Sequence, residues 1–278
     1  MKKIKILSKC FLILLIVAVA GILGYLTGSS VNNKYFCINK YANLSREKYS
    51  DDISNIDYVG KSPESFTPTQ VYLISLKNST SKDYVKNLKG EVKISIGITQ
   101  YIKATSTRNG NTYSFTNISS SSLYDLAERC TYTPQGEMRI QKGKLSGPDK
   151  SDIKWTDNYT EYTYDEFSEE LGREPINQCQ YIVSSKTVTE SALIKKENGT
   201  YTYEILLDPF YSTFCYVNEI AHNSNTDKST ITFKYVKLTF TIDENFNILT
   251  QYSTEIYDLE YGGIPVEITT NFEISMNY

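Results

Sequence analysis

Long stretches of alternating apolar and polar side chains restrict most strongly how this chain can fold. Six apolar residues occupy even positions between Val92 and Ala104, and six more do so between Ile264 and Met276. A period of two places alternate side chains on opposite faces of a β-strand. Each stretch therefore predicts one long amphipathic strand, and residues 201–207 predict a shorter one.

Turn residues between these stretches indicate antiparallel hairpins. Asn109-Gly110, Glu197-Asn198-Gly199 and Asp243-Glu244-Asn245 have the composition of tight connections between neighbouring strands. Between Ile231 and Ile242 the apolar residues change from odd to even positions, which predicts a bulge or a bend. Gly262-Gly263 precedes a strand pattern and is also interpreted as a turn.

Four segments carry helix signals. Thr67-Pro68-Thr69-Gln70 and Thr163-Tyr164-Asp165-Glu166 are both typical of capping boxes, and Gly172 is placed to end the second helix. A third helix is expected from Asp208-Pro209, and a fourth between Ser122 and Cys130. The predicted fold class is α+β, mainly β, with a curved antiparallel sheet (a half-barrel) packed on a few helices.

The N-terminus combines four lysines within nine residues with an unbroken apolar run from Cys10 to Leu26. We interpret residues 10–27 as a transmembrane signal anchor and residues 1–9 as a cytoplasmic basic tail. A cleaved signal peptide with its site at Ala18-Val19-Ala20 is the alternative, but apolar residues continue beyond that site. The expected location is the cell membrane, with a single pass and the N-terminus inside.

The segment that follows the apolar run divides into two parts. Residues 28–62 are polar and lack periodicity, so we interpret them as an extracytoplasmic stalk. Residues 63–278 are expected to form one β-rich extracytoplasmic domain, because no second linker interrupts them.

Charge and cysteine content limit the partners of the whole segment beyond the apolar run, which holds four of the five cysteines. Beyond the N-terminal lysines, 25 basic residues stand against 32 acidic ones, which argues against nucleic acid as a partner. In an oxidising compartment, an even number of cysteines favours one or two disulfides, with the pairing left open. A metal site is not expected, because no pair has C-x-x-C spacing. The candidates for disulfides are Cys37, Cys130, Cys179 and Cys215.

The residues for catalysis are few, and we expect neither an enzyme nor a cofactor. His222 is the only histidine, and its place near the end of the third predicted helix gives it a structural role. Asp243 begins a segment that resembles a calcium loop, but Ile248 stands where that loop needs glycine. Trp155 and nearby tyrosines invite a glycan-binding hypothesis, although strands also favour tyrosine.

The order of elements resembles the LolA/LolB/LppX-like lipoprotein-carrier superfamily over about residues 65–278. Phe66-Thr67-Pro68 leads into a helix, and a long strand follows Gly90; Leu207-Asp208-Pro209 leads into another helix, with Leu238–Asp243 and Ile248–Tyr257 as strands after it. The resemblance implies a half-barrel with helices in its mouth that holds lipid or another apolar group. The apolar N-terminal helix departs from that family, where a lipobox cysteine or a cleavable signal is expected.

Periodicity alone supplies the candidate lining of such a cavity. We therefore expect a membrane-tethered extracytoplasmic binding protein for a lipid or other apolar ligand. The alternative is an envelope interaction or adhesion module with a solid core, which would bind protein or cell-wall glycan. The candidate lining residues are Ile94, Ile96, Ile98, Phe210, Phe214, Val217, Val266, Ile268 and Phe272.

Overall fold

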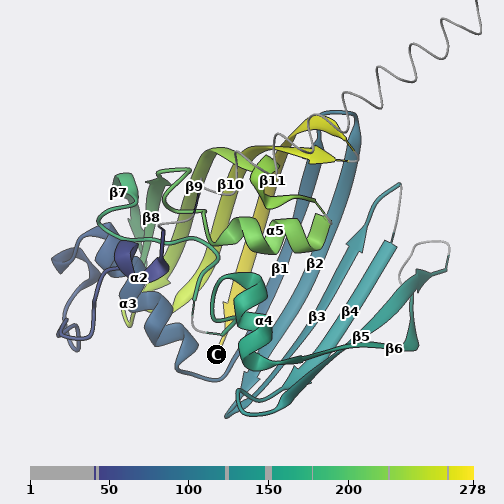
Figure 1. The fold of residues 1–278 in the computed structure, drawn as a ribbon. Helices are drawn as coiled ribbons and strands as arrows, with labels where there is room; N and C mark the ends of the chain where they lie inside the picture. Colours follow the sequence, from purple (N-terminus) through teal and green to yellow (C-terminus); the bar gives the residue numbers. More distant parts are fainter. Residues whose placement is uncertain are drawn as a thin grey trace, which may run out of the picture.

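The computed structural model describes residue 41 and residues 44–122, 125–147, 152–176, 178–224, 226–261 and 263–278. Its strands form one 11-stranded antiparallel sheet in the order β6-β5-β4-β3-β2-β1-β11-β10-β9-β8-β7 (Figure 1). The strands are β1 (Tyr84–Ile94), β2 (Ile98–Asn109), β3 (Thr112–Ser120), β4 (Asp125–Tyr132), β5 (Glu137–Ser146), β6 (Asp152–Thr163), β7 (Val188–Glu197), β8 (Thr200–Leu207), β9 (Thr232–Asp243), β10 (Ile248–Tyr261) and β11 (Ile264–Asn277).

Two runs of sequential strands, β1 to β6 and β7 to β11, meet where β1 pairs with β11. Lys86 lies opposite Met276 in this pairing, and Gly90 lies opposite Phe272. A Cβ atom on Gly90 would lie 2.4 Å from the Cδ1 atom of Phe272, so only glycine fits there. The Phe272 ring therefore lies over Gly90, where β1 and β11 join the two halves of the sheet.

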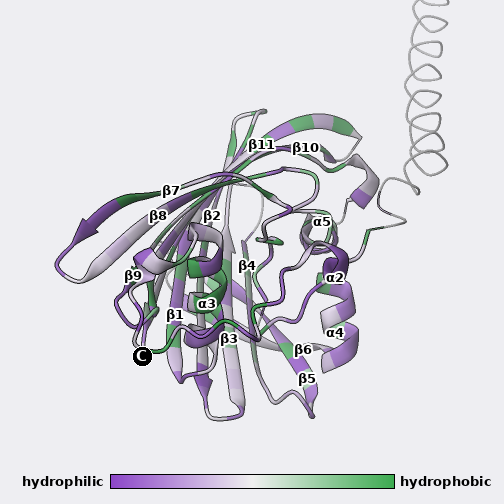
Figure 2. Cartoon of the chain, turned by 90° about the vertical axis from the view of Figure 1, so that its left-hand side faces the viewer, coloured by the Kyte–Doolittle hydropathy of each residue, from purple (hydrophilic) through white to green (hydrophobic). Residues whose placement is uncertain are grey.

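All the described helices lie on one face of the sheet, and the sheet curves around them (Figures 1 and 2). They are α2 (Arg46–Tyr49), α3 (Pro68–Thr80), α4 (Tyr164–Leu171) and α5 (Tyr216–Ser224), with 3-10 turns η1 (Pro63–Ser65) and η2 (Lys228–Thr230). Buried residues of α3 and α5 pack with the inward side chains of β8 to β11 in the main core. Burial of this apolar surface provides most of the driving force for the arrangement.

Both predicted capping boxes are present. The Thr67 amide donates to Gln70 Oε1 at 3.0 Å, and the Gln70 amide donates to Thr67 Oγ1 at 3.3 Å. At α4 the same reciprocal bonds join Thr163 and Glu166. Gly172 ends α4 in the left-handed region, with φ of 68°. These local bonds satisfy amides that the first turn of a helix leaves without partners.

The predicted hairpin turns and the predicted bulge are also confirmed. Asn109-Gly110 joins β2 to β3, residues 197–199 join β7 to β8, and residues 243–245 lie between β9 and β10. Ile256 and Tyr257 are consecutive on β10, but their partners on β9 are Tyr235 and Phe233, which are two residues apart. Lys234 is the extra residue, and it accounts for the change of apolar phase.

Two predictions of local structure are wrong. Residues 95–97 form a turn, so the stretch from Val92 to Ala104 is a hairpin of two strands, in which Ile94 lies opposite Ile98. Gly97 permits the turn, because its φ of 87° is unfavourable for other residues. The expected helix in 122–130 is β4 over its described part from residue 125, since pairing with β3 and β5 outweighs local helix propensity.

The third helix begins later than expected. Asp208 accepts from the amides of Phe210 and Tyr211 at 2.9 and 2.8 Å, which forms a turn and not a helix start. The helix α5 begins only at Tyr216. A capping residue can thus close an isolated turn, and the helix starts where apolar residues meet the core.

The N-terminal part of the described chain lies against the domain. Within the predicted stalk, Tyr41, Ile56 and Tyr58 are partly buried against the main core. The proposed signal anchor, residues 10–27, lies outside the described residues. Among the helices that the structure describes, none has the length and apolar content needed to span a bilayer.

Candidate functional site

An open cleft of about 520 Å³ lies between α3 and residues 178–183. The loop around α2 forms one wall, and the ends of β2 and β3 meet at the Asn109-Gly110 hairpin on another. Its volume is in the range of small-molecule sites. The lining residues are Arg46, Ser50, Asp51, Ile53, Tyr72, Leu73, Leu76, Lys77, Thr80, Ser81, Arg108, Tyr113, Gln178, Cys179, Tyr181, Ile182 and Val183.

Part of this lining is apolar. Leu73 and Leu76 lie on consecutive turns of α3 and are only half-buried, although they pack against the main core. Ile53 is half-buried as well, whereas Ile182 and Val183 are buried. The cleft therefore exposes aliphatic carbon that the protein itself does not cover completely.

Three cations line the same cleft. Arg108 Nε donates to the Gly110 carbonyl at 3.1 Å, and its Nη1 donates to the Thr80 carbonyl at the end of α3. Lys77 lies in the last turn of α3, with its side chain exposed. Arg46 comes from α2. The described lining contains one carboxylate, Asp51, so the cleft has an excess of positive charge.

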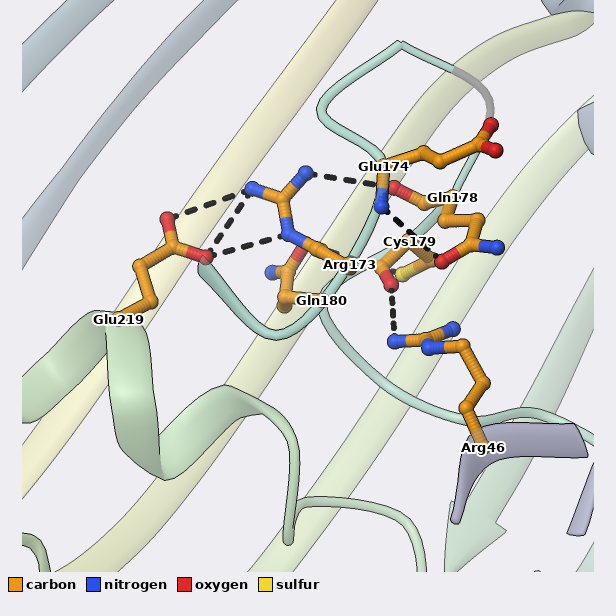
Figure 3. A network of polar contacts seen from close by, with 7 residues as sticks. All are labelled: Arg46, Arg173, Glu174, Gln178, Cys179, Gln180 and Glu219. Carbon is orange, nitrogen blue, oxygen red and sulfur yellow. Dashed lines mark hydrogen bonds and ion pairs between the residues drawn. The ribbon is translucent and has the colours of Figure 1, made fainter. Parts of the chain in front are cut away.

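A network of polar contacts holds residues 173–174 and 178–180 in place next to the cleft (Figure 3). Arg173 binds the Glu219 carboxylate of α5 with two nitrogens, at 3.2 Å from Nε and 3.0 Å from Nη2. Arg46 Nη2 donates to the Cys179 carbonyl at 3.0 Å. The Glu174 amide donates to Gln178 Oε1 at 3.1 Å. Arg46 of α2 and Arg173, which follows α4, thus both bind backbone carbonyls of the segment that forms one wall of the cleft.

Behind the cleft, Tyr181 contacts a buried carboxyl group, that of Glu255. Its hydroxyl donates to Glu255 Oε1 on β10, and Thr270 Oγ1 donates to Glu255 Oε2 at 2.9 Å. Glu255 is fully buried. Burial raises the pKa of Glu255 to about 7, although both hydrogen bonds act in the opposite direction. Glu255 is therefore protonated at mildly acidic pH, and the stability of the core around it depends on pH near neutrality.

A second tyrosine connects the cleft with the sheet. The hydroxyl of Tyr72, on α3, is 3.2 Å from Gln251 Oε1 on β10. Burial raises the pKa of Tyr72 well above its usual range. The ring packs edge-on against Phe240, with centroids 5.0 Å apart. Tyr72 therefore has an ordinary structural explanation in addition to its place in the cleft lining.

The lining of this cleft includes none of the nine residues proposed from periodicity. Val217, Val266 and Ile268 belong to the buried main core, and Ile94 packs against it. Phe214 lies in a smaller cluster with Ile182 and Cys215, and Phe210 stacks on Tyr41 at 5.6 Å. Ile96 lies in the β1–β2 turn and is 51% exposed, Ile98 begins β2, and Phe272 covers Gly90.

Sequence reasoning missed the cleft lining because most of it lies outside periodic segments. Residues 178–183 come from an irregular connection, and Arg46 from a helix of only four residues, so their patterns do not indicate a face. The run Tyr181-Ile182-Val183 was the one available signal, since three consecutive apolar residues in a loop need a buried partner.

Three of the four disulfide candidates are described, and their thiols are free. Cys130 and Cys215 are buried, and Cys179 is half-buried in the cleft lining. Burial raises the pKa values of the Cys130 and Cys215 thiols. Cys37 lies outside the described residues. No disulfide is found within the described part of the chain.

The other candidate groups have structural partners. His222 Nδ1 pairs with the Glu170 carboxylate across α5 and α4. The guanidinium of Arg129 lies 4.2 Å from the Trp155 ring centroid, and that of Arg139 lies 4.6 Å from the Tyr159 centroid. The cation–π contacts occupy one face of each ring that a glycan would use. Within the described residues, no group of acidic, histidine or cysteine side chains is arranged to hold a metal ion.

Comparisons with known proteins do not assign the chain to a family. No family model matches it, and no curated protein matches it. Among solved structures, a LolA superfamily protein from Nitrosomonas europaea aligns with 76% of this chain and 93% of its own, at 8% identity and a TM-score of 0.25.

Two further solved structures show similarities of the same strength. A porin-like protein from Bacteroides uniformis aligns with 72% of this chain and 98% of its own, at 10% identity and a TM-score of 0.24. A de novo designed transmembrane β-barrel aligns with 70% of this chain and 95% of its own, at 5% identity and a TM-score of 0.20. At these identities and TM-scores, none of the three similarities assigns the chain to a family.

Proposed function

We propose that this chain is a membrane-tethered extracytoplasmic binding protein that holds a lipid or another ligand with a large apolar part. The observation that carries the proposal is the open cleft of about 520 Å³, in which half-buried aliphatic side chains remain accessible. A curved sheet closed on its inner face by helices provides a rigid support for such a site. The role is non-enzymatic.

The membrane tether in this proposal rests on the sequence. Lysines at the N-terminus and the apolar run from Cys10 to Leu26 favour a retained anchor with the domain outside. Protease treatment of intact bacteria is expected to degrade the domain and leave the tether in the membrane. Full-length chain released into the medium would contradict the tether without affecting the binding proposal.

The binding proposal is tested by native mass spectrometry of the full chain purified from an expressing bacterium, followed by solvent extraction. A stoichiometric adduct that extraction removes is the expected result, and its mass identifies the ligand class. A clean apo mass that stays unchanged after incubation with membrane lipids would contradict the proposal.

The second candidate function is an envelope interaction module, and one observation favours it. The edge strand β7 is exposed from Thr189 to Glu197, and Leu193 and Ile194 are exposed on it. Unpaired strand edges can accept a strand from a partner protein. If the purified chain carries no ligand, site-specific cross-linking from Ile194 in intact cells is expected to identify that partner.

A further inference from the structure

The cleft has three positive side chains with no acidic partner at ion-pair distance. No ion pair of Arg46, Lys77 or Arg108 is found among the described residues, whose surface has many lysine and arginine pairs. Arg46 and Arg108 donate to backbone carbonyls, which carry no formal charge. Lys77 is near enough to the exposed Asp52 to help lower the pKa of that carboxyl, but the two do not form an ion pair. Such a concentration is unusual in a chain whose net charge is −3.

The one carboxylate of the lining already has hydrogen-bond donors. Asp51 Oδ2 accepts from the Ser185 amide at 2.6 Å, and Asp51 Oδ1 accepts from the Ser185 hydroxyl at 2.8 Å. These bonds tie the α2 loop to residues beyond the cleft wall. Asp51 therefore has a structural role, and its single negative charge does not balance the three cations.

A fourth cation lies beside the cleft on the inner face of the sheet. Lys86 pairs with Ser106 on β2, one inward position away from Arg108. Diagonal neighbours of this kind are about 7–8 Å apart between Cα atoms. Burial and the neighbouring Arg173 lower the pKa of Lys86, whereas the Glu219 carboxylate acts in the opposite direction. Lys86 and Arg108 thus lie on the same face of neighbouring strands, next to the cleft.

Positive charge and aliphatic carbon meet in the same opening. Leu73, Leu76 and Lys77 lie next to one another on α3, so one helix contributes both kinds of surface. A neutral apolar ligand would leave the cations without partners, whereas a small anion would leave the leucines exposed to water. An amphiphile with an anionic end satisfies both.

We propose that the cleft binds an anionic amphiphile, with its phosphate or carboxylate group at Lys77, Arg108 and Arg46 and its apolar part along α3. This inference rests on the proposed binding function and specifies its ligand class. The anionic group can come from a membrane lipid or from a soluble metabolite, because the cleft recognises the charge and the adjoining apolar chain.

The test compares three probes of equal chain length on the full-length protein by native mass spectrometry. The probes are dodecyl phosphate, zwitterionic dodecylphosphocholine and neutral dodecyl maltoside, and inorganic phosphate is added as a fourth arm. Dodecyl phosphate is expected to bind most tightly. Lys77→Glu should weaken its binding about tenfold and leave dodecyl maltoside unchanged, because reversing one partly screened charge affects only the charged probe.

Lys103→Glu is the matched control, since Lys103 is exposed on the opposite face of β2 and receives the same change of charge. If the three amphiphiles bind equally well and Lys77→Glu has no effect, the cleft does not select an anionic ligand. That result would leave the proposed binding function standing. If inorganic phosphate binds as tightly as dodecyl phosphate, the apolar part of the proposed ligand contributes nothing, and the amphiphile proposal is wrong. Failure of every amphiphile to bind would overturn the proposed function itself.

Discussion

Replacement of the buried Glu255 by glutamine should stabilise the protein at alkaline pH and have little effect in acid. The pKa of Glu255 is about 7 in the folded chain, compared with an ordinary value of 4.5. Each unit of pKa difference corresponds to about 1.4 kcal/mol, so ionisation of Glu255 costs the folded state about 3 kcal/mol. Glutamine is neutral and nearly the same size, and it can still accept from Tyr181 and bond to Thr270.

The sign of the pH dependence follows from proton binding. Between pH 4.5 and 7 the unfolded chain has lost this proton while the folded chain retains it. The free energy of unfolding of the wild type therefore falls as pH rises through that interval. Below pH 4.5 both states are protonated, and above pH 7 both are ionised, so the contribution becomes constant at each end.

Urea unfolding at pH 4.5 and pH 8 measures this difference directly. Glu255→Gln should exceed the wild type by about 3 kcal/mol at pH 8 and match it to within about 1 kcal/mol at pH 4.5. Glu244→Gln, in the exposed β9–β10 turn, is the control and should change neither value. A Glu255→Gln effect that is the same at both pH values would refute a carboxyl group held neutral by burial.

Three further predictions test the fold. Gly90→Ala should cost about 1–3 kcal/mol of stability in chemical unfolding, because the new methyl group meets the ring of Phe272; an unchanged midpoint would contradict that contact. Thr67→Ala should cost about 1 kcal/mol through loss of the capping box, and Thr67→Ser should retain most of that stability. In a double-mutant cycle, Arg173→Gln and Glu219→Gln should show a coupling of about 1–3 kcal/mol, whereas additive effects would mean that their ion pair contributes nothing.

The elements predicted correctly are those whose determinants are local in sequence. The capping residues at Thr67 and Thr163 fixed two helix starts, and the change of apolar phase near Lys234 located a bulge. The expected helix in 122–130 failed because long-range pairing decides the structure there. Residues 125–132 have acceptable helix formers, but two neighbouring strands hold them extended.

The candidate site was less accessible to sequence reasoning than the fold. Apolar periodicity identified buried positions such as Val266 and Ile268, which is what a stripe on an inner face most often marks. The cleft instead depends on irregular backbone positioned by Arg46 and Arg173, and on cations at the ends of α3 and β2. Nothing in the local pattern around Arg108 indicates that it meets the end of a helix 28 residues earlier in the chain.

The most direct test of ligand binding in the cleft is the alkylation rate of Cys179. This thiol lines the cleft and is half-buried, whereas Cys130 and Cys215 are buried and serve as internal references. The full chain is treated with N-ethylmaleimide with and without dodecyl phosphate, and peptide mass spectrometry follows each cysteine. Bound ligand should slow modification of Cys179 several-fold and leave the other two rates unchanged. An unchanged Cys179 rate under conditions where native mass spectrometry shows a bound probe would place the ligand elsewhere on the protein.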